Sequence, residues 1–319
     1  MQINFNNALV TGGAGFIGSH LVEALLSAGC KVTVLDNLSS GNLLNLAPVM
    51  DHITFYKNDI RELEMLEKAA EGCDVIFHLA AVVAVQETIS NPVESTMIND
   101  VGTINVLEAA RAKNVRRVVL ASSCAVYGDD PRSPKTETMT PRPASPYAVH
   151  KLSAEHYARV YFDLFGLETV SLRFFNVYGP RQDPSSPYSG VISIFMAKAV
   201  SNQVPVIYGD GNQSRDFVYV TDVVKANLLA AGTDNLAGNV LNIGTGSDVL
   251  INRLWELIAS LSGQRLAPRY EPARSGDILN SVAGMELTQS ILNFKNDFTL
   301  EQGLEMTFDW YRCQRTEDG

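Results

Sequence analysis

Paired cysteines, long apolar runs and basic blocks are all missing from this chain of 319 residues. Its four cysteines are scattered without the spacing of a disulfide framework or a zinc site, so we expect free thiols and no metal centre. The densest apolar run, Leu79 to Val85, is far shorter than the roughly 20 residues that cross a bilayer. Residues Met1 to Asn7 carry no signal-peptide pattern. We therefore expect a cytoplasmic protein without a membrane partner.

Positive charge is also scarce. The 25 Lys and Arg residues against 35 Asp and Glu give a formal net charge of -10, and no cationic cluster could neutralise a nucleic-acid backbone. Nucleic acid is therefore excluded as an expected partner. Hydrophobic residues make up 46% of the chain, which is typical of a globular protein, and the length fits about two domains of ~150 residues each.

The first half of the chain alternates short β-branched runs with stretches whose apolar residues recur every three or four positions. This alternation predicts an α/β protein with a doubly wound (Rossmann) parallel sheet that helices cover on both faces. The expected strands are 8–11, 31–35, 53–56, 75–78, 117–121 and 168–172, and the expected helices are 16–28, 63–71, 101–113 and 147–165.

The alternation becomes irregular after Arg173, where Pro and Gly residues punctuate the chain. We expect a second, smaller α/β domain, which binds the substrate, to begin there. Later strand and helix patterns, at 217–220, 223–231 and 240–243, indicate a return to the first domain. The expected cofactor domain is 1–173 with 218–246, and the expected substrate domain is 174–217 with 247–319.

A glycine-rich turn follows the first expected strand, in Thr11-Gly12-Gly13-Ala14-Gly15-Phe16-Ile17-Gly18. Glycine is needed where the backbone turns tightly and approaches a pyrophosphate, and the start of the next helix offers free N–H groups to the anion. Asp36 ends the second strand, where a carboxylate can bind both ribose hydroxyls of an adenosine and repel a 2′-phosphate. The pattern therefore predicts NAD rather than NADP.

Two more segments follow strands at the same sheet edge, where doubly wound sheets bind their ligands. They are Asp59-Ile60 and Leu79-Ala80-Ala81, whose small residues leave room for adenine and ribose. Taken alone, the glycine motif could also be a turn without a ligand, and these features oppose that interpretation. The cofactor residues predicted so far are Gly12, Gly15, Phe16, Ile17, Gly18, Asp36, Asp59, Ile60, Leu79, Ala80 and Ala81.

Tyr147 and Lys151 lie four residues apart on an expected helix, and so on one face. A phenol with a pKa of about 10 is a poor base at neutral pH, but the Lys cation and an oxidised nicotinamide both favour the phenolate. Serine hydroxyls follow the fifth strand, in 122–128. Without the other motifs, an amphipathic helix with a core Tyr and a solvated Lys would be the better interpretation of this pair.

Together these motifs resemble the extended short-chain dehydrogenase/reductase family over nearly the whole chain. The matching segments are 11–18, 36–37, 59–60, 78–81, Asn99, 122–128, 147–151, 173–181 and 215–220. The resemblance implies that Tyr147 is the acid/base, that Ser123 holds the sugar hydroxyl, and that Lys151 binds the nicotinamide ribose. It adds Asn37, Asn99, Ser122 and Phe174 to the expected cofactor residues, and it implies a homodimer.

Members of this family act mainly on nucleotide-linked sugars, and the residues after the serine distinguish their reactions. Sugar 4,6-dehydratases carry an Asp-Glu pair there and UDP-glucuronate decarboxylases a Glu, whereas this chain has Cys124-Ala125. Without a carboxylate, the resemblance favours 4-epimerisation. Tyr147 takes the O4 proton, the C4 hydride passes to NAD, and the flat 4-keto sugar turns over before the hydride returns.

The stretch 176–192 looks most like UDP-N-acetylglucosamine 4-epimerases. Arg215 and Arg274 match the family's diphosphate contacts, although each could instead pair with a neighbouring Asp. Ser281 stands where epimerases limited to UDP-glucose carry a bulky Tyr, so it leaves room for a 2-acetamido group. His150 departs from the usual pattern of the Tyr-x-x-x-Lys motif. The other expected substrate contacts are Asn176, Gly190, Val191, Val206, Tyr208 and Asp277.

The sequence thus predicts a 4-epimerase for UDP-GlcNAc and UDP-GalNAc, with UDP-Glc and UDP-Gal also open. The alternatives are a UDP-glucuronate or UDP-N-acetylglucosaminuronate 4-epimerase, a keto-sugar reductase, and a non-catalytic NAD-binding module. Asp36 argues against the reductase because net reductases of this family commonly use NADPH. The presence of both Tyr147 and Lys151 argues against the inactive module.

Overall fold

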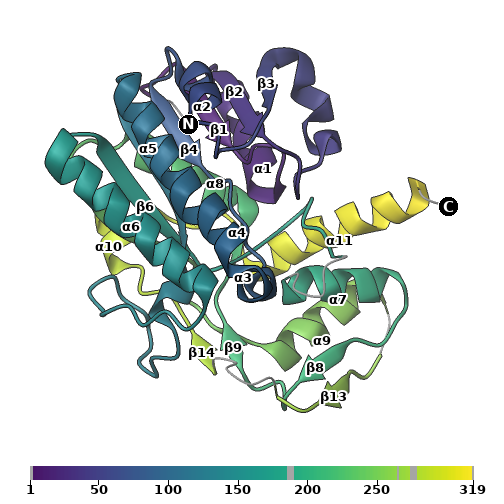
Figure 1. Cartoon of the computed structure of the whole chain (residues 1–319). Coiled ribbons are helices and arrows are strands. Elements are labelled where there is room, and N and C mark those ends of the chain that lie inside the picture. The colour runs from purple at the N-terminus through teal and green to yellow at the C-terminus, as the bar shows by residue number, and fades with distance from the viewer. Residues whose placement is uncertain (1–2, 185–189, 264–265, 274–278, 318–319) are drawn as a thin grey trace.

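The computed structural model describes residues 3–184, 190–263, 266–273 and 279–317. A seven-stranded sheet with the order β11-β6-β5-β4-β1-β2-β3 forms its centre (Figure 1). All neighbouring strands in it are parallel. The strands are β1 (Asn7–Thr11), β2 (Lys31–Asp36), β3 (Ile53–Lys57), β4 (Val75–His78), β5 (Arg117–Ser123), β6 (Glu168–Phe174) and β11 (Asn239–Ile243). The expected doubly wound α/β fold is confirmed.

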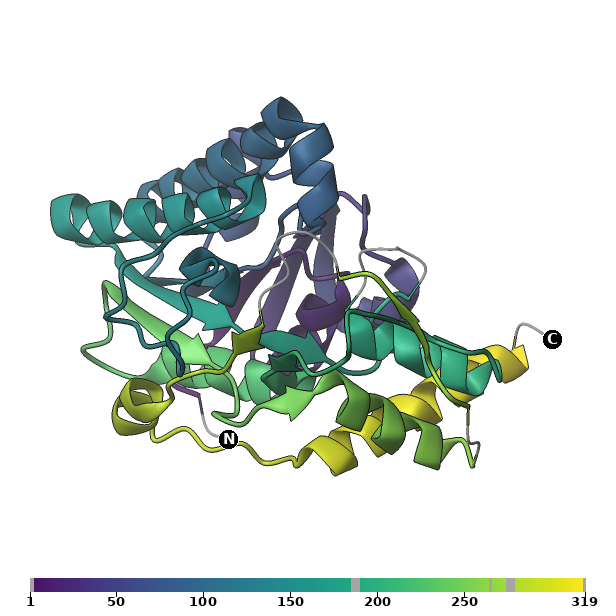
Figure 2. The ribbon, with the colours of Figure 1, turned by 90° about the horizontal axis from the view of Figure 1, so that it is seen from below.

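Helices cover both faces of this sheet (Figures 1 and 2). On one face lie α1 (Phe16–Ser27) and α8 (Val220–Gly232), and on the other α2 (Leu63–Ala70), α5 (Gly102–Ala112) and α6 (Pro146–Phe165). Every residue of β4 is buried, as expected for a central parallel strand, and its first three residues are apolar. Shorter helical segments are η1 (Leu43–His52), α3 (Val85–Ser90), α4 (Pro92–Thr96), η2 (Met97–Val101) and η3 (Cys124–Tyr127).

Helix α6, which carries Tyr147 and Lys151, has well-defined ends. The side chain of Ser145 accepts a hydrogen bond from the Ala148 N–H at 3.2 Å, and Pro146 occupies the first turn, where its missing N–H costs nothing. Gly166 ends the helix in the left-handed conformation, with φ of 70°. The local sequence thus fixes where the helix begins, and with it the position of Tyr147 in the first turn.

A smaller lobe follows the end of β6 (Figure 1). Its helices α7 (Val191–Val200), α9 (Ile251–Leu261) and α11 (Leu300–Glu317) share one apolar core, which includes Phe195, Trp255 and Phe308. Its short strands pair as β7 (Asn176–Tyr178) with β10 (Phe217–Tyr219), β8 (Val206–Tyr208) with β13 (Arg269–Glu271), and β9 (Ser214–Arg215) between β12 (Val249–Leu250) and β14 (Asn280–Ser281). Within the described ranges, no helix has the length and apolar character needed to span a bilayer.

The chain returns to the large sheet after β10, because α8 packs on it and β11 extends it beside β6. Arg117 of β5, which is fully buried, donates to the carbonyls of Ala230, Ala231 and Thr233 at the end of α8 and pairs with Glu168. Residues of α10 (Glu286–Leu292) and its flanks also join the core beneath the sheet. The expected domain boundaries remain predictions.

Candidate active site

The glycine-rich turn between β1 and α1 is tight and leaves no room for side chains. Gly12 has φ of +72°, and a Cβ there would lie 2.7 Å from the Ala80 nitrogen. A Cβ on Gly18 would collide with the Gly12 carbonyl oxygen and lie 2.8 Å from the Gly13 Cα. The turn therefore touches the segment that follows β4, and the N–H groups that begin α1 remain available to an anion. This cradle fits the pyrophosphate of NAD.

Asp36 is held at the same turn. Its carboxylate accepts hydrogen bonds from the Ala14 N–H at 2.9 Å and the Leu38 N–H at 2.8 Å, and only 7% of the residue is exposed. Burial raises the pKa of Asp36, although the hydrogen bonds from these two donors act to lower it. Each oxygen keeps a lone pair, so the carboxylate is oriented and still able to accept from ribose hydroxyls.

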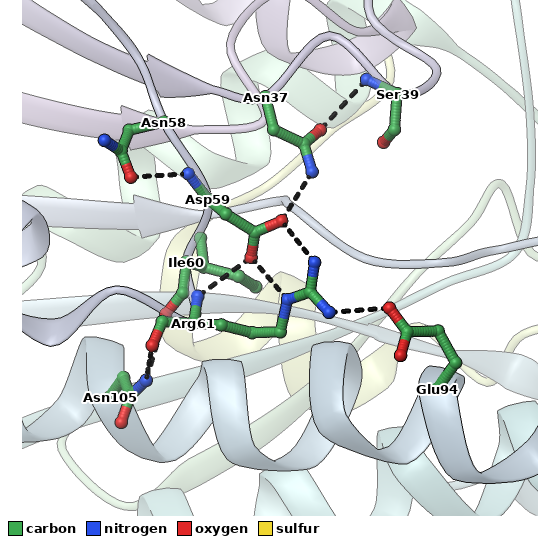
Figure 3. Close-up of polar contacts among 8 residues, drawn as sticks. All are labelled: Asn37, Ser39, Asn58, Asp59, Ile60, Arg61, Glu94 and Asn105. Carbon is green, nitrogen blue, oxygen red and sulfur yellow. Dashed lines mark hydrogen bonds and ion pairs between the residues drawn. The ribbon is translucent and has the colours of Figure 1, made fainter.

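Asn37 and Asp59, predicted from separate strands, are brought together (Figure 3). Asn37 donates to the Asp59 carboxylate at 2.8 Å, and Arg61 donates to it at 2.9 Å through Nε. Arg61 also reaches Glu94 of α4 at 2.6 Å. The carbonyl of Ile60 accepts from Asn105 at 3.2 Å. The sequence analysis did not predict the ion pair of Arg61 with Asp59, although a cation two residues after a carboxylate could have indicated it.

The expected catalytic residues meet where β5 ends beside α6. Ser123 Oγ caps η3 by accepting from the Ala125 N–H at 3.1 Å, and it also hydrogen-bonds with Tyr147. Lys151 Nζ donates to the Ala121 carbonyl at 2.8 Å and lies 5.8 Å from the centre of the Tyr147 ring.

Burial dominates the electrostatics of Tyr147 and Lys151. Burial raises the pKa of Tyr147 to about 12, although its hydrogen bond with Ser123 opposes the rise. Burial also lowers the pKa of Lys151 to about 8. Desolvation thus disfavours the charged form of each group.

The expected sugar-binding residue Ser281 reaches this centre from the smaller lobe. In the parallel pair β14 and β9, Ser281 lies opposite Arg215, and Ser281 is only 7% exposed. The thiol of Cys124 hydrogen-bonds with both Ser281 and Ser123, and Arg215 lies close enough to act on its charge. Burial raises the pKa of Cys124 to about 11, so it stays a neutral thiol. Arg274 and Asp277 lie outside the described residues.

The other predicted contacts are distributed over both lobes. Asn176 of β7 donates to the Asp216 carbonyl at 2.8 Å, and Phe174 ends β6 with its side chain buried. Phe16 and Ile17, at the start of α1, pack against the core of the smaller lobe. Gly190 and Val191 begin α7, whereas Val206 and Tyr208 lie on β8, so these four belong to elements separate from β5 and α6. Their binding roles remain predictions.

A buried ion pair beside the centre was not predicted. Glu155 accepts from Arg173 at 2.7 and 2.9 Å and from Ser122 Oγ at 2.5 Å. The Ser122 side chain therefore faces this pair, and any cofactor contact from Ser122 would come from its backbone. One signal in the sequence could have found Glu155, which lies four residues after Lys151 on the expected helix. The partner Arg173 is brought close by the sheet, where it pairs with Ser122.

Comparisons with known proteins identify a family for this chain. Residues 8–244 match the model of the NAD dependent epimerase/dehydratase family. The chain is 41% identical to a putative UDP-glucose 4-epimerase of Methanocaldococcus jannaschii over 306 residues, which cover 95% of this chain and 98% of that protein.

Two solved structures share the fold. A UDP-N-acetylglucosamine 4-epimerase of Methanobrevibacter ruminantium M1, in complex with UDP-N-acetylmuramic acid, has a TM-score of 0.94 and 40% identity, covering 98% of this chain and 100% of that one. A UDP-glucose 4-epimerase of Thermus thermophilus in complex with NAD has a TM-score of 0.87 and 38% identity, covering 96% of this chain and 99% of that one.

These matches confirm the expected class of enzyme, an NAD-dependent nucleotide-sugar 4-epimerase, and NAD as its cofactor. The inactive NAD-binding module is therefore set aside. The chain belongs to the NAD dependent epimerase/dehydratase family.

Proposed function

We propose that the protein interconverts UDP-GlcNAc and UDP-GalNAc, and that it also accepts UDP-Glc and UDP-Gal. The observation that carries this proposal is the small side chain of Ser281, which hydrogen-bonds with Cys124, the residue that follows Ser123 at the end of β5. A Ser at this point leaves space for a 2-acetamido group, which a Tyr would fill. The similarity to both a UDP-N-acetylglucosamine and a UDP-glucose epimerase supports this substrate range.

In the proposed reaction, bound NAD supplies a hydride acceptor and donor. Tyr147 acts as the phenolate, which the Lys151 cation and the oxidised nicotinamide would together favour, and takes the proton from O4 of the sugar while Ser123 holds that hydroxyl in place. Lys151 binds the nicotinamide ribose, and Arg215 binds the diphosphate while the 4-keto sugar turns over. Cys124 and Ala125 supply no carboxylate for the elimination of water, so return of the hydride completes an epimerisation.

The first experiment incubates the purified protein with UDP-GlcNAc, UDP-Glc or UDP-GlcA, without added NAD, and resolves the products by chromatography. We expect conversion of UDP-GlcNAc to UDP-GalNAc. Conversion of UDP-GlcA alone would favour the alternative of a uronate 4-epimerase, for which UDP-N-acetylglucosaminuronate is then the next substrate to try.

A variant tests the role of Ser281 directly. In Ser281→Tyr, we expect activity on UDP-GlcNAc to fall at least about tenfold relative to activity on UDP-Glc, because overfilling a packed pocket costs about 1 to 3 kcal/mol. Ser281→Ala, which keeps the space, is the matched control and should retain the substrate ratio. If Ser281→Tyr slows both substrates equally, Ser281 does not border the acetamido group.

We also propose a cytoplasmic homodimer. Helix α6 lies on the outside of its helical layer (Figure 2). Exposed apolar residues recur on one face of this helix. They are Val149, Tyr157, Val160 and Leu164, of which Leu164 is 70% exposed. A second copy packed on this face would bury them in a two-fold contact. Light scattering should give the mass of a dimer, and that of a monomer for Leu164→Glu. A monomeric wild-type protein would contradict the proposal.

A further inference from the structure

His150 is buried in the active-site wall but has no role in the chemistry described so far. It precedes Lys151 on α6 and is only 4% exposed. Successive residues on a helix point about 100° apart, so the two side chains diverge. Lys151 reaches β5 at the Ala121 carbonyl, whereas the His150 ring contacts Asn99 of η2 and Thr96 at the end of α4.

The hydrogen bonds of Asn99 define the protonation state of His150. Asn99 Oδ1 accepts from the Val82 N–H at 2.8 Å, and Nδ2 donates to the Val82 carbonyl at 3.0 Å, so backbone groups fix the orientation of the amide. Nδ2 also lies 3.2 Å from His150 Nδ1, which must therefore accept. The hydrogen of the neutral ring is then on Nε2, which lies 3.3 Å from Thr96 Oγ1.

The same network holds the segment that follows β4. At its beginning, the Ala80 N–H donates to Thr11 Oγ1 at 3.4 Å, and at its end Val82 is bound on both sides by Asn99. His78 lies between Thr11, at 2.8 Å, and Thr103, at 3.0 Å. Thr103 in turn donates to the Asn99 carbonyl at 2.5 Å. Residues 79–82 are thus fixed at the glycine turn and at Asn99, and His150 connects Asn99 to the catalytic helix.

We propose that neutral His150 is a positioning residue that ties residues 79–82 to the helix of Tyr147 and Lys151, and that its protonation releases this connection. A protonated ring carries hydrogens on both nitrogens, so Nδ1 would face the Asn99 amide hydrogens, donor against donor. The Asn99 amide cannot turn to compensate without losing both bonds to Val82. The inference rests on the proposed contact of 79–81 with the cofactor.

The charged surroundings of His150 come from several elements. Asp100 of η2 lies 3.9 Å from Nε2, Lys151 follows on α6, and His78 of β4 lines the same small cavity beside Lys151. Glu87 of α3 is exposed, and Glu108 of α5 binds Tyr161 farther along α6. Burial lowers the pKa of His150, the Asp100 carboxylate opposes this, and Lys151 adds to it. The ring is therefore neutral at pH 7 and gains its proton on acidification.

Two variants distinguish the roles of the two nitrogens of the His150 ring. In His150→Asn the side-chain oxygen can take the place of Nδ1, so the bond to Asn99 is kept without a titrating group. In His150→Gln the amide reaches the Nε2 position instead, and the bond to Asn99 is lost. The measured quantity is the Kd for NAD of the full-length chain between pH 5 and pH 8, with kcat for epimerisation measured alongside.

We expect wild-type NAD affinity to fall as the pH drops below 6.5, the ordinary pKa of histidine. His150→Asn should keep wild-type affinity at pH 7 and lose this dependence. His150→Gln should bind about fivefold more weakly at every pH, the factor that corresponds to one net hydrogen bond. A pH-independent wild-type Kd, or an unchanged profile in His150→Asn, would overturn the proposal.

Should either variant fail to fold, NMR titration of the His150 ring in the wild-type protein replaces it. We expect the ring to titrate with the same midpoint as the NAD affinity, and a different midpoint would overturn the proposal. Because NAD binding is measured without sugar, a failure of the proposed substrate assignment leaves this test unaffected. Likewise, a failure of this NAD-binding test leaves the proposed substrate assignment unaffected.

Discussion

Gly18 gives the sharpest structural prediction for the cofactor cradle. A Cβ at this position would meet three backbone atoms of the preceding turn, including the Gly13 Cα at 2.8 Å and the Gly12 carbonyl carbon at 2.9 Å. No side-chain rotation can relieve such a contact, so the turn between β1 and α1 must open. We therefore expect Gly18→Ala to destabilise the protein and to weaken NAD binding together.

The magnitude follows from the kind of contact. Forcing a methyl group into a packed site costs about 1 to 3 kcal/mol, and each kcal/mol lowers the Tm by about 2 to 4 °C in proteins of 150 to 250 residues. In an open helical site, replacing Gly by Ala would instead stabilise by about 1 kcal/mol. The sign of the change therefore distinguishes a crowded Gly18 from an ordinary helical glycine.

Gly232, at the end of α8, is the matched control. A Cβ there would lie 3.5 Å from Asn4 Oδ1, which is an ordinary contact. Thermal unfolding of the NAD-stripped proteins separates stability from ligand binding, because bound NAD itself raises the Tm. Gly232→Ala should match or exceed wild type, whereas Gly18→Ala should unfold several degrees lower, within the range above. A Gly18→Ala protein with wild-type Tm and wild-type NAD content would refute the reasoning.

Three further substitutions test the chemistry of the site. Tyr147→Phe should lower kcat by about 10²- to 10⁴-fold at unchanged NAD content, and a variant that keeps more than about a tenth of the activity would remove Tyr147 as the acid/base. Asp36→Ala should weaken NAD binding and reduce the discrimination against NADP in titrations of the stripped protein, whereas equal binding of both by wild type would contradict the assigned role. Glu155→Gln should lower the free energy of unfolding by about 3 to 5 kcal/mol in urea, because it leaves the Arg173 guanidinium buried without its carboxylate; an unchanged unfolding midpoint would show that the pair contributes nothing net.

The sheet and its helices could be predicted because their signals are local and repeated. Each strand of the first half is an apolar run, and each crossover has helical periodicity, so the topology follows from the rules for parallel sheets. The short strands β9, β12 and β14 offered no such signal, because two residues carry no periodicity. Their pairing depends on tertiary contacts instead.

In the site, too, the features with local signals were predictable and those that depend on tertiary contacts were not. Asp36 and the glycines were predictable because each occupies a fixed place relative to a strand. The raised pKa of Tyr147 was not, since it depends on how much surrounding protein buries the ring. The same holds for His150, whose role depends on the orientation of the Asn99 amide, and that is fixed by Val82 rather than by neighbours in sequence.

The clamp made by Arg117 constrains the order of folding during synthesis. Its guanidinium binds carbonyl groups that lie 113 to 116 residues later in the chain. While the smaller lobe is being synthesised, Glu168 is already part of the chain but these carbonyl groups are not. Pairing of β5 with its neighbours would then bury the Arg117 cation with only one of its partners, which is costly. The large sheet therefore reaches its final form only after α8 and β11 have emerged, and we expect shorter nascent chains to be less stable.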